Sequence, residues 1–448
     1  MRLRPLALLV PAALALLGST ARAEDTHALI AAAAQAAEAQ VVAWRRDIHE
    51  HPELGNREKR TSALVARELK KLGFDEVQTG IAHTGVVGIL KGGKPGGVVA
   101  LRADMDALPV EEKSGLPFAS KVRMEYNGTE VPVMHACGHD AHTAILMGVA
   151  TVLAGMRDQI PGTVSFVFQP AEEGAPEGEE GGARLMIKEG LWEKTKHPTA
   201  IFGLHTWPGP AGSILYRSGP TMAASDTIKI VVKGKQTHGS QPWGGIDPIV
   251  VAAQIVQALQ VIPSRQLDIT KAPSVVTIGS IHGGTKSNII SDEVRLQLTL
   301  RSYQTDTRKK LIESIKRIVK AQAESANMPA DKMPEVIVSD DQAPALYNQP
   351  ALCAEVRGLV GSSIGPDNVL TREPVMGAED FAEYGLTKEK VPLCMFWLGT
   401  QPPEVVAEAK AKGTTLPSLH SPFFKPVPEP SIETGVKALT SAVIGMMK

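Results

Sequence analysis

The chain has 448 residues, of which 43% are hydrophobic and 21% are charged, and its 47 Lys and Arg residues nearly balance its 48 Asp and Glu residues. This composition is that of a globular protein, and a chain of this length is expected to form two domains rather than one core. The balanced charge, the lack of a basic stripe and the low aromatic content of 4% exclude nucleic acid as an expected partner.

The first 23 residues predict a secretory signal peptide. Arg2 and Arg4 supply a positive start, the apolar run Leu6–Leu17 is too short to span a bilayer, and Ala21–Ala23 is typical of a cleavage site. We therefore expect cleavage before Glu24 and a periplasmic or secreted protein with no membrane segment in its mature form. The alternative interpretation is an ordinary buried N-terminal helix.

The next part of the chain alternates between helical and strand patterns. Residues 27–72 are expected to be helical with a break near Pro52, and residues 143–156 form an apolar helix. Short apolar strands are predicted at Val98–Ala103, Thr163–Phe168 and Ala200–Leu204. This alternation of buried strands with helices predicts an α/β domain built on a largely parallel mixed sheet that is flanked by helices.

After Tyr216 the pattern changes to strands in which apolar and polar residues alternate. These strands are predicted at 226–233, 274–281 and 293–302, with helices at 247–261 and 307–326. The order β-α-β-β-α predicts a small antiparallel α+β domain at 217–332, inserted into the first domain. The α/β pattern resumes beyond Met333, so residues 24–216 and 333–448 are assigned to the first domain.

Three cysteines are present, which is an odd number for an exported chain. Cys353 lies in a helical pattern and Cys394 in an apolar strand, and these two could form a disulfide in an oxidising compartment. We favour two buried free thiols, because a free cysteine behaves as a small apolar residue. Cys137 lies instead in a segment that is rich in metal-binding side chains.

That segment, Met134–His142, holds a thiol, three imidazoles and a carboxylate, although the whole chain has only twelve histidines. Further charged or metal-binding residues follow the three predicted strands: Asp104 and Asp106, Glu172 and Glu173, and His205. The carboxyl ends of parallel strands meet at one edge of a sheet, so these groups are expected to converge there. Cys137 and His139, two residues apart before a helix, could reach the same edge and hold one ion.

The adjacent carboxylates of Glu172 and Glu173 are suited to two different tasks. One can ligate a metal while the other takes the proton from a water molecule. The rival interpretation is a thiol protease that uses Cys137 and His139, which needs the base within hydrogen-bond reach and a third orienting group. We disfavour it, because neighbours this close in sequence seldom reach that geometry and the glutamate pair would have no task.

Together these segments resemble the metallopeptidase family of the aminoacylases and dinuclear zinc carboxypeptidases (metallopeptidase family 20), in particular its branch of N-acyl-amino-acid amidohydrolases, hippurate hydrolases and auxin-conjugate hydrolase-like carboxypeptidases. The similarity covers nearly all of the mature chain. The motifs that carry it are Arg46–Gly55, Leu101–Pro109, Met134–Asp140, Gln169–Gly174, Gly203–His205, Gly234–Ser240, Pro242–Asp247, Ser287–Ile290, Leu300–Ser302, Met376–Phe381 and Leu419–Pro422. The resemblance implies a zinc-peptidase-like catalytic domain with an inserted lid and dimerisation domain.

The resemblance also implies one or two divalent metal ions at the site. Glu172 would be the general base, and the metal ligands would be Cys137, His139, Glu173, His205 and His420. Five ligands for two ions require a bridge, which a Cys137 thiolate could supply. The mixture of sulfur, nitrogen and oxygen donors is compatible with Zn, Mn, Ni or Co and does not choose among them. We expect Zn or Mn first, with Ni or Co as the alternatives.

Relatives outside this branch have a His-x-Asp motif where this chain has Asp104 and Asp106, so no histidine ligand is carried over to that position. Asp106 is expected to orient the metal ligands. The remaining members of the metal-binding segment, His135, Asp140 and His142, are expected to support the loop and the helix that follows it.

In the inserted domain, the resemblance implies three residues that act on the substrate. His238 would reach the scissile carbonyl from the partner subunit of a homodimer, or of a higher homo-oligomer, and stabilise the oxyanion. Asn288 and Arg301 would bind the amide oxygen or the carboxylate of the substrate, and a guanidinium suits a carboxylate because it can donate two parallel hydrogen bonds.

We therefore expect an exported, metal-dependent amidohydrolase that cleaves the amide bond of a small N-acyl amino acid or a short peptide. One alternative is a metallocarboxypeptidase that prefers peptides. A second, less favoured alternative is a non-catalytic protein that binds a metal or a ligand on the same scaffold. The intact pair Glu172 and Glu173 argues against this last interpretation, because a protein without activity would be free to lose the base.

Overall fold

The computed structural model describes residues 11–428 and 430–447, and it describes side chains from residue 26 onwards with the exception of residue 341. The start of the expected signal peptide, residues 1–10, lies outside the described residues. The chain forms two compact units: the first runs to Tyr216 and includes Ala351–Arg372 and the residues from Cys394 on, and the second comprises Arg217–Pro350 and Glu373–Leu393. Across the described residues, no helix combines the length and the apolar character needed to cross a membrane.

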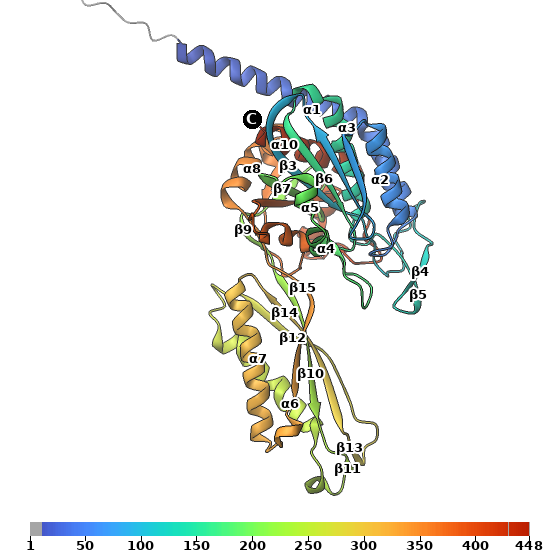
Figure 1. Ribbon diagram of the computed structural model, residues 1–448, viewed down its shortest axis with the longest axis vertical. Helices are drawn as coiled ribbons and strands as arrows, with labels where there is room; N and C mark the ends of the chain where they lie inside the picture. Colours follow the sequence, from blue (N-terminus) through green and yellow to red (C-terminus); the bar gives the residue numbers. More distant parts are fainter. Residues whose placement is uncertain (1–10, 429, 448) are drawn as a thin grey trace, which may run out of the picture. The chain divides into compact units, whose positions relative to one another are not determined.

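The first unit is built on a sheet of eight strands in the order β1-β2-β6-β3-β7-β18-β8-β17. Its elements are α1 (Pro11–Glu50), α2 (Lys59–Lys71), β1 (Glu76–Ile81), β2 (Gly85–Lys91), β3 (Lys94–Asp104), β4 (Arg123–Tyr126), β5 (Thr129–Pro132), α3 (His139–Gly155), β6 (Pro161–Gln169), α4 (Gly182–Lys188), α5 (Leu191–Thr195), β7 (Ala200–Pro210), β8 (Ile214–Tyr216), α8 (Pro350–Ile364), β17 (Val369–Thr371), β18 (Leu393–Gln401), α9 (Pro403–Lys412) and α10 (Ser431–Met446) (Figure 1).

The strands β6, β3 and β7 at the centre of this sheet run parallel to one another, whereas β1 and β2 are antiparallel to their neighbours. This confirms the predicted α/β class with a largely parallel mixed sheet. Because the three central strands are parallel, their carboxyl ends lie at one edge, and the residues that follow each strand are brought together there.

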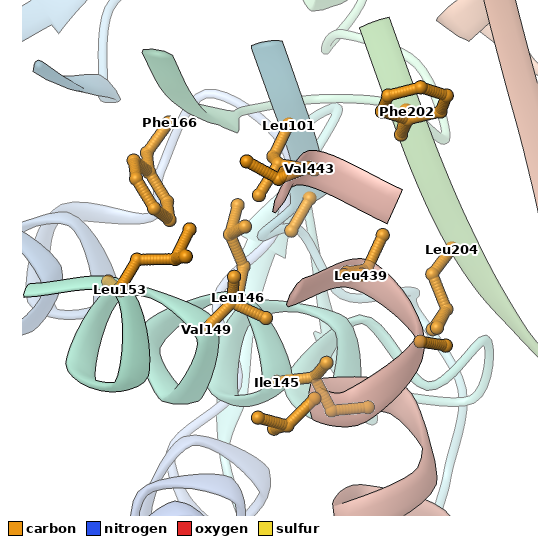
Figure 2. Packing of buried hydrophobic residues seen from close by; sticks show 14 of the residues in the cluster. Leu101, Ile145, Leu146, Val149, Leu153, Phe166, Phe202, Leu204, Leu439 and Val443 are labelled. Atoms are coloured by element: carbon orange, nitrogen blue, oxygen red, sulfur yellow. The ribbon is translucent and has the colours of Figure 1, made fainter. Parts of the chain in front are cut away.

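Helix α3 covers the central strands and positions the site, because its N-terminus lies beside their carboxyl ends. Its residues Ile145, Leu146, Val149 and Leu153 are buried and face Leu101 of β3, Phe166 of β6 and α10 (Figure 2). Full burial of a leucine or isoleucine side chain contributes about 1.5–3 kcal/mol relative to its exposed state. The apolar helix predicted at 143–156 is therefore confirmed, and it is held tightly against the sheet.

The cysteine prediction was wrong. Cys353 of α8 and Cys394 of β18 form a disulfide, with their Cα atoms 5.7 Å apart, and Cys137 is the free cysteine. Both disulfide partners are fully buried among apolar residues. The sequence pattern indicated this burial but could not show that the two side chains lie within bonding distance, because they are separated by 41 residues.

The second unit is an antiparallel sheet of four strands in the order β12-β14-β10-β15, with two helices on one of its faces (Figure 1). Its elements are β9 (Gly219–Met222), β10 (Ala224–Lys233), β11 (Thr237–His238), α6 (Pro248–Leu259), β12 (Ser274–Gly283), β13 (Ile289–Ile290), β14 (Glu293–Ser302), α7 (Thr305–Ser325), β15 (Glu335–Ala343) and β16 (Leu346–Asn348). Buried residues of β10, β14, α6 and α7 form a single core.

The expected boundary at 332/333 falls too early. Strand β15 pairs with β10, from Glu335 opposite Val231 to Ala343 opposite Ser225, so it closes the second sheet instead of resuming the first. The chain returns to the first unit at Ala351. The strand itself gives no local signal of which sheet it joins, since that depends on its partner strand and not on its own periodicity.

Candidate metal centre

Residues from four segments converge at the carboxyl edge of the central strands. Several groups of side chains there could each hold an ion, because their ligand atoms lie within 4.8 Å of one another. Three consist of predicted site residues alone, and Asp104, His139 and His142 form a further group; the three are Cys137, His139 and His205; Cys137, Glu173 and His420; and His139, Glu172 and Glu173. The structure thus brings together all five sequence-predicted ligands and Glu172. The Sγ atom of Cys137 lies 3.5 Å from Nε2 of His205, and Nε2 of His420 lies 3.0 Å from Oε1 of Glu173.

The loop before α3 can bring Cys137 and His139 to this edge only because a glycine separates them. Gly138 has a φ of 87°, a conformation that L-residues with a side chain rarely adopt. A Cβ atom there would also collide with Oγ1 of Thr206. That hydroxyl donates a 2.8 Å hydrogen bond to the carbonyl oxygen of Cys137, and this bond holds the loop against β7.

Two of the histidines are oriented by hydrogen bonds that engage Nδ1 and leave Nε2 for a metal. His139 donates from Nδ1 to the backbone oxygen of Asp106 at 2.8 Å, with Oδ1 of Asp106 at 3.2 Å. His205 donates from Nδ1 to the backbone oxygen of Thr206 at 2.7 Å. Both nitrogens need a hydrogen to make these bonds, so in the neutral imidazoles Nε2 carries the lone pair.

The glutamate pair lies on the turn that follows β6. The backbone N–H of Glu173 donates to Oδ2 of Asp106 at 2.9 Å, so Asp106 contacts both the His139 ring and this turn. The carboxylate of Glu173 faces His420, whereas Oε2 of Glu172 lies 3.7 Å from Nε2 of His139. The two adjacent carboxylates therefore enter the same site from different positions.

The electrostatics of the site fit a divalent cation. Burial, and then the charges of Glu173 and Glu172, raise the pKa of the Cys137 thiol well above its ordinary value. Burial lowers the pKa of His139, but Asp104, Asp106 and Glu173 outweigh it and raise that pKa to about 10. Nε2 of His139 is nevertheless buried without a hydrogen-bond partner. A bound cation would satisfy that nitrogen and balance the crowded acidic groups.

Asp104 and His142 support the site from behind. His142 accepts the backbone N–H of Thr206 at Nε2 (2.7 Å) and donates from Nδ1 to Oδ1 of Asp104 (2.5 Å), so both of its ring nitrogens are engaged. The other carboxylate oxygen of Asp104 accepts from Arg102 at 2.7 Å. The sequence pointed to Asp104 through its place after a strand, but it offered no signal for Arg102 or Thr206.

A second buried network holds the first turn of α3 against α1. Oδ2 of Asp140 contacts Nε of Arg45 at 2.7 Å and Nδ1 of His49 at 2.8 Å, and Nε2 of His49 lies 3.0 Å from Glu112. His135 is fully buried nearby, and burial lowers its pKa to about 3. Asp140, the residue after His139, thus contacts a helix that is distant in sequence. Sequence reasoning missed this contact.

The substrate-binding residues expected in the inserted domain all lie in the second unit. His238 forms a hydrogen bond through Nδ1 with the Ser240 hydroxyl at 2.7 Å, and the neighbouring Gly239 N–H donates to the backbone oxygen of Asn288 at 2.8 Å. Arg301 lies on β14, is half-buried and hydrogen-bonds Ser225. His238 and Asn288 are therefore brought together within this unit, and Arg301 lies on a different strand.

Comparisons with known proteins agree with the motifs and with the fold. Residues 100–444 match the model of Peptidase family M20/M25/M40. The chain is 42% identical to thermostable carboxypeptidase 1 of Saccharolobus solfataricus, over 81% of this chain and 86% of that protein. It is 37% identical to an N-acetylcysteine deacetylase of Bacillus subtilis, over 81% and 88%.

A solved structure supports the same family assignment. The YXEP protein of Bacillus subtilis, described as a dinuclear metal-binding peptidase from the M20 family, superposes with a TM-score of 0.72 at 30% identity, covering 92% of this chain and 99% of its own. Residues 100–444, which match the family model, include the strands and loops that carry the site. The chain therefore belongs to peptidase family M20/M25/M40 and is a metal-dependent hydrolase that acts on amide bonds.

Proposed function

We propose that this protein is an exported amidohydrolase that releases the amino acid from small N-acyl amino acids. Up to two divalent ions would be held by Cys137, His139, Glu173, His205 and His420. We expect Zn or Mn first, and Ni or Co is also compatible with this donor set. When bound, such ions lower the pKa of a coordinated water and polarise the amide carbonyl.

The chain's own residues supply the proton transfers in this proposal. Glu172 takes a proton from the attacking water, and its carboxyl then passes that proton to the nitrogen of the leaving amine. Asp106 keeps the lone pair of His139 on Nε2 and holds the amide of Glu173, so the ligands keep their orientation. His238 would stabilise the oxyanion, and Asn288 and Arg301 would bind the carbonyl or carboxylate of the substrate.

One observation carries the proposal more than any other. Glu172 and Glu173 are adjacent in sequence, yet Glu173 is engaged by His420 at 3.0 Å while Oε2 of Glu172 lies 3.7 Å from His139 at the same site. A carboxylate beside the ligands, and separate from the ligating one, is what a general base for water attack requires.

The test is Glu172→Gln, with Glu177→Gln as the matched control. Glu177 is an exposed acid on the same loop, whose backbone N–H bonds Asn127. We expect Glu172→Gln to lower kcat by about 10²–10⁴-fold with unchanged metal content by elemental analysis, and Glu177→Gln to behave like the wild type. A Glu172→Gln variant with near-normal kcat would show that Glu172 is not the base.

A peptide-preferring metallocarboxypeptidase is the second candidate, and the similarity to a carboxypeptidase of Saccharolobus solfataricus favours it. The similarity to an N-acetylcysteine deacetylase favours the acyl amino acids. A panel of N-acetyl and N-benzoyl amino acids against dipeptides, each assayed by kcat/KM after loading with Zn, Mn, Co or Ni, separates the two. Higher kcat/KM on dipeptides throughout the panel would replace our assignment with the second.

Export is supported by the charged and apolar pattern of residues 1–23 and by the Cys353–Cys394 disulfide, since disulfides persist mainly in oxidising compartments. We expect periplasmic or secreted protein to begin at Glu24 when its N-terminus is sequenced from cells. Protein that retains Met1 and stays in the cytoplasmic fraction would contradict this expectation.

A homodimer through the inserted domain is supported by an open edge of its sheet. Strand β12 is an edge strand, and the exposed apolar side chains of Ile281 on β12 and of Ile249 and Val250 on α6 are available for a second copy. Sedimentation equilibrium should give a dimer that Ile281→Lys weakens. Ile337→Lys on the opposite edge strand β15 is the control, and a monomeric wild type would contradict the proposal.

A further inference from the structure

Glu58 is a fully buried carboxyl that the proposed mechanism does not use. It immediately precedes α2, at the position where a side chain often caps the helix, but its carboxyl makes no such cap. Oε1 instead accepts the backbone N–H of Ala171 at 2.9 Å, and Oε2 bonds the Thr84 hydroxyl at 2.5 Å. A buried carboxyl is costly unless it is well bonded, so this placement needs a reason.

The contact with Ala171 is unusual because of the backbone conformation there. Ala171 has a φ of 50°, in the left-handed region that a residue with a Cβ seldom adopts and that costs roughly 1–2 kcal/mol. The strained residue lies directly before Glu172. The backbone N–H of this strained residue is the donor to the carboxyl of Glu58.

A second carboxylate holds the other side of the same turn. The N–H of Glu173 donates to Oδ2 of Asp106, so the amides on both sides of Glu172 are anchored by acids from two distant segments. Burial, and then the charge of Asp106, raise the pKa of Glu58 to about 8. Glutamine therefore imitates the neutral form of this carboxyl, with one oxygen to accept from Ala171 and an amide to face Thr84.

We propose that Glu58 is a positioning residue, which keeps Ala171 in its strained conformation and thereby aims the carboxylate of Glu172 at the reacting water. The proposal rests on the assignment of Glu172 as the base. It concerns the turn itself, however, and not metal binding, because Glu173 keeps its separate anchor on Asp106.

The kinetic test compares Glu58→Met, which matches the length of the side chain but accepts no hydrogen bond of this kind, with Glu58→Gln. We expect Glu58→Met to lower kcat at least about tenfold, with KM and metal content close to those of the wild type, because a misplaced base slows only the chemical step. Glu58→Gln should keep kcat within about threefold of the wild type. Thr84→Val, which removes the other partner of Glu58, should do the same, since it spares the bond to Ala171. A Glu58→Met variant with wild-type kcat overturns the proposal.

A double-mutant cycle separates positioning from a general structural role. Glycine adopts a positive φ without strain, so Ala171→Gly should make kcat less dependent on Glu58, and Glu58→Met should cost less in the Ala171→Gly background. Independent, additive losses would mean that the two residues do not act on one another.

Amide hydrogen exchange of the metal-free protein gives a readout that does not involve activity. The Ala171 amide should be protected, and Glu58→Met should remove that protection while Glu58→Gln retains it. A rapidly exchanging Ala171 amide in the wild type overturns the proposal even if Glu58→Met does not fold. If Glu172→Gln stays active, the base assignment fails instead, and the exchange result is unaffected by that failure.

Discussion

At the scale of single residues, the site depends on which nitrogen of each histidine is committed to the protein. His139 and His205 give Nδ1 to backbone carbonyls, whereas His142 has both nitrogens engaged and supports Asp104. Three histidines of the site thus divide into two whose Nε2 accepts no backbone N–H and one, His142, whose two ring nitrogens are both engaged by protein groups. The hydrogen-bond partners make that division, because a metal needs a nitrogen whose lone pair is not already taken by a donor.

Asp106 offers a prediction at this scale. Asp106→Ala removes the acceptor at the Glu173 amide and one of the two acceptors at Nδ1 of His139. We expect metal affinity to fall about 10–100-fold, as is usual when a group that orients metal ligands is lost. Competition with a chelator measures the affinity. Asp367→Ala, at an exposed site away from the metal centre, is the control, and an unchanged affinity of the Asp106 variant would refute the prediction.

At the scale of elements, the start of α3 does most of the positioning. Its first residue is His139, and its apolar side chains pack on β3 and β6, so the ligand is attached to a rigid part of the core. Asp140 in the same first turn contacts Arg45 and His49 of α1 at 2.7 and 2.8 Å. The helix terminus is therefore held from the sheet on one side and from α1 on another.

A substitution at Gly138 tests how the start of α3 is positioned. Gly138→Ala forces a residue with a Cβ into a φ of 87° and drives that atom against Thr206, whose hydroxyl holds the Cys137 carbonyl. We expect a loss of unfolding free energy larger than the roughly 1–2 kcal/mol that the backbone conformation alone costs, together with weaker metal binding.

Gly178→Ala is the matched control for that prediction. Gly178 has a similar φ of 84°, and a Cβ there meets nothing within 4 Å. The losses of unfolding free energy in the two metal-free variants, measured by urea unfolding, should therefore differ by the cost of the collision with Thr206. Equal losses in both variants would show that the contact with Thr206 does not matter.

At the scale of the whole molecule, the Cys353–Cys394 disulfide joins a helix and a strand that are 41 residues apart in the chain. The segment that leaves for the second unit, Glu373–Leu393, lies between these cysteines. The disulfide therefore joins two parts of the first unit that lie on either side of this segment in the chain. The loop that it closes is long, so it restricts the unfolded chain more than a short loop would.

Removing both cysteines as Cys353→Ala/Cys394→Ala should lower the unfolding free energy by an amount on the order of 2–4 kcal/mol, with the closed loop as the main source. Urea unfolding with and without a reductant checks it. The reductant should shift the midpoint of the wild type but not that of the double variant, and a wild type that is insensitive to complete reduction would contradict the expectation.

Much of this protein followed from its sequence. The alternation of apolar strands with helices predicted the α/β class, and the residues after three strands, with Cys137 and His139, predicted where a metal centre would form. The motif order placed the chain in its family, which the comparisons confirmed. The fold class and the family are confirmed, and the predicted ligands converge at one edge because parallel strands bring their carboxyl ends together.

Only the tertiary structure decided the rest. It paired β15 with β10, joined Cys353 to Cys394, and placed the Glu58 carboxyl on the amide of Ala171. Each of these depends on a distance between residues far apart in the chain, whereas composition and periodicity report only on neighbours. The sequence by itself determined which chemical groups are available and on which kind of element they lie. The packing of those elements decided which groups touch, because contact distances of about 3 Å are set by the folded core.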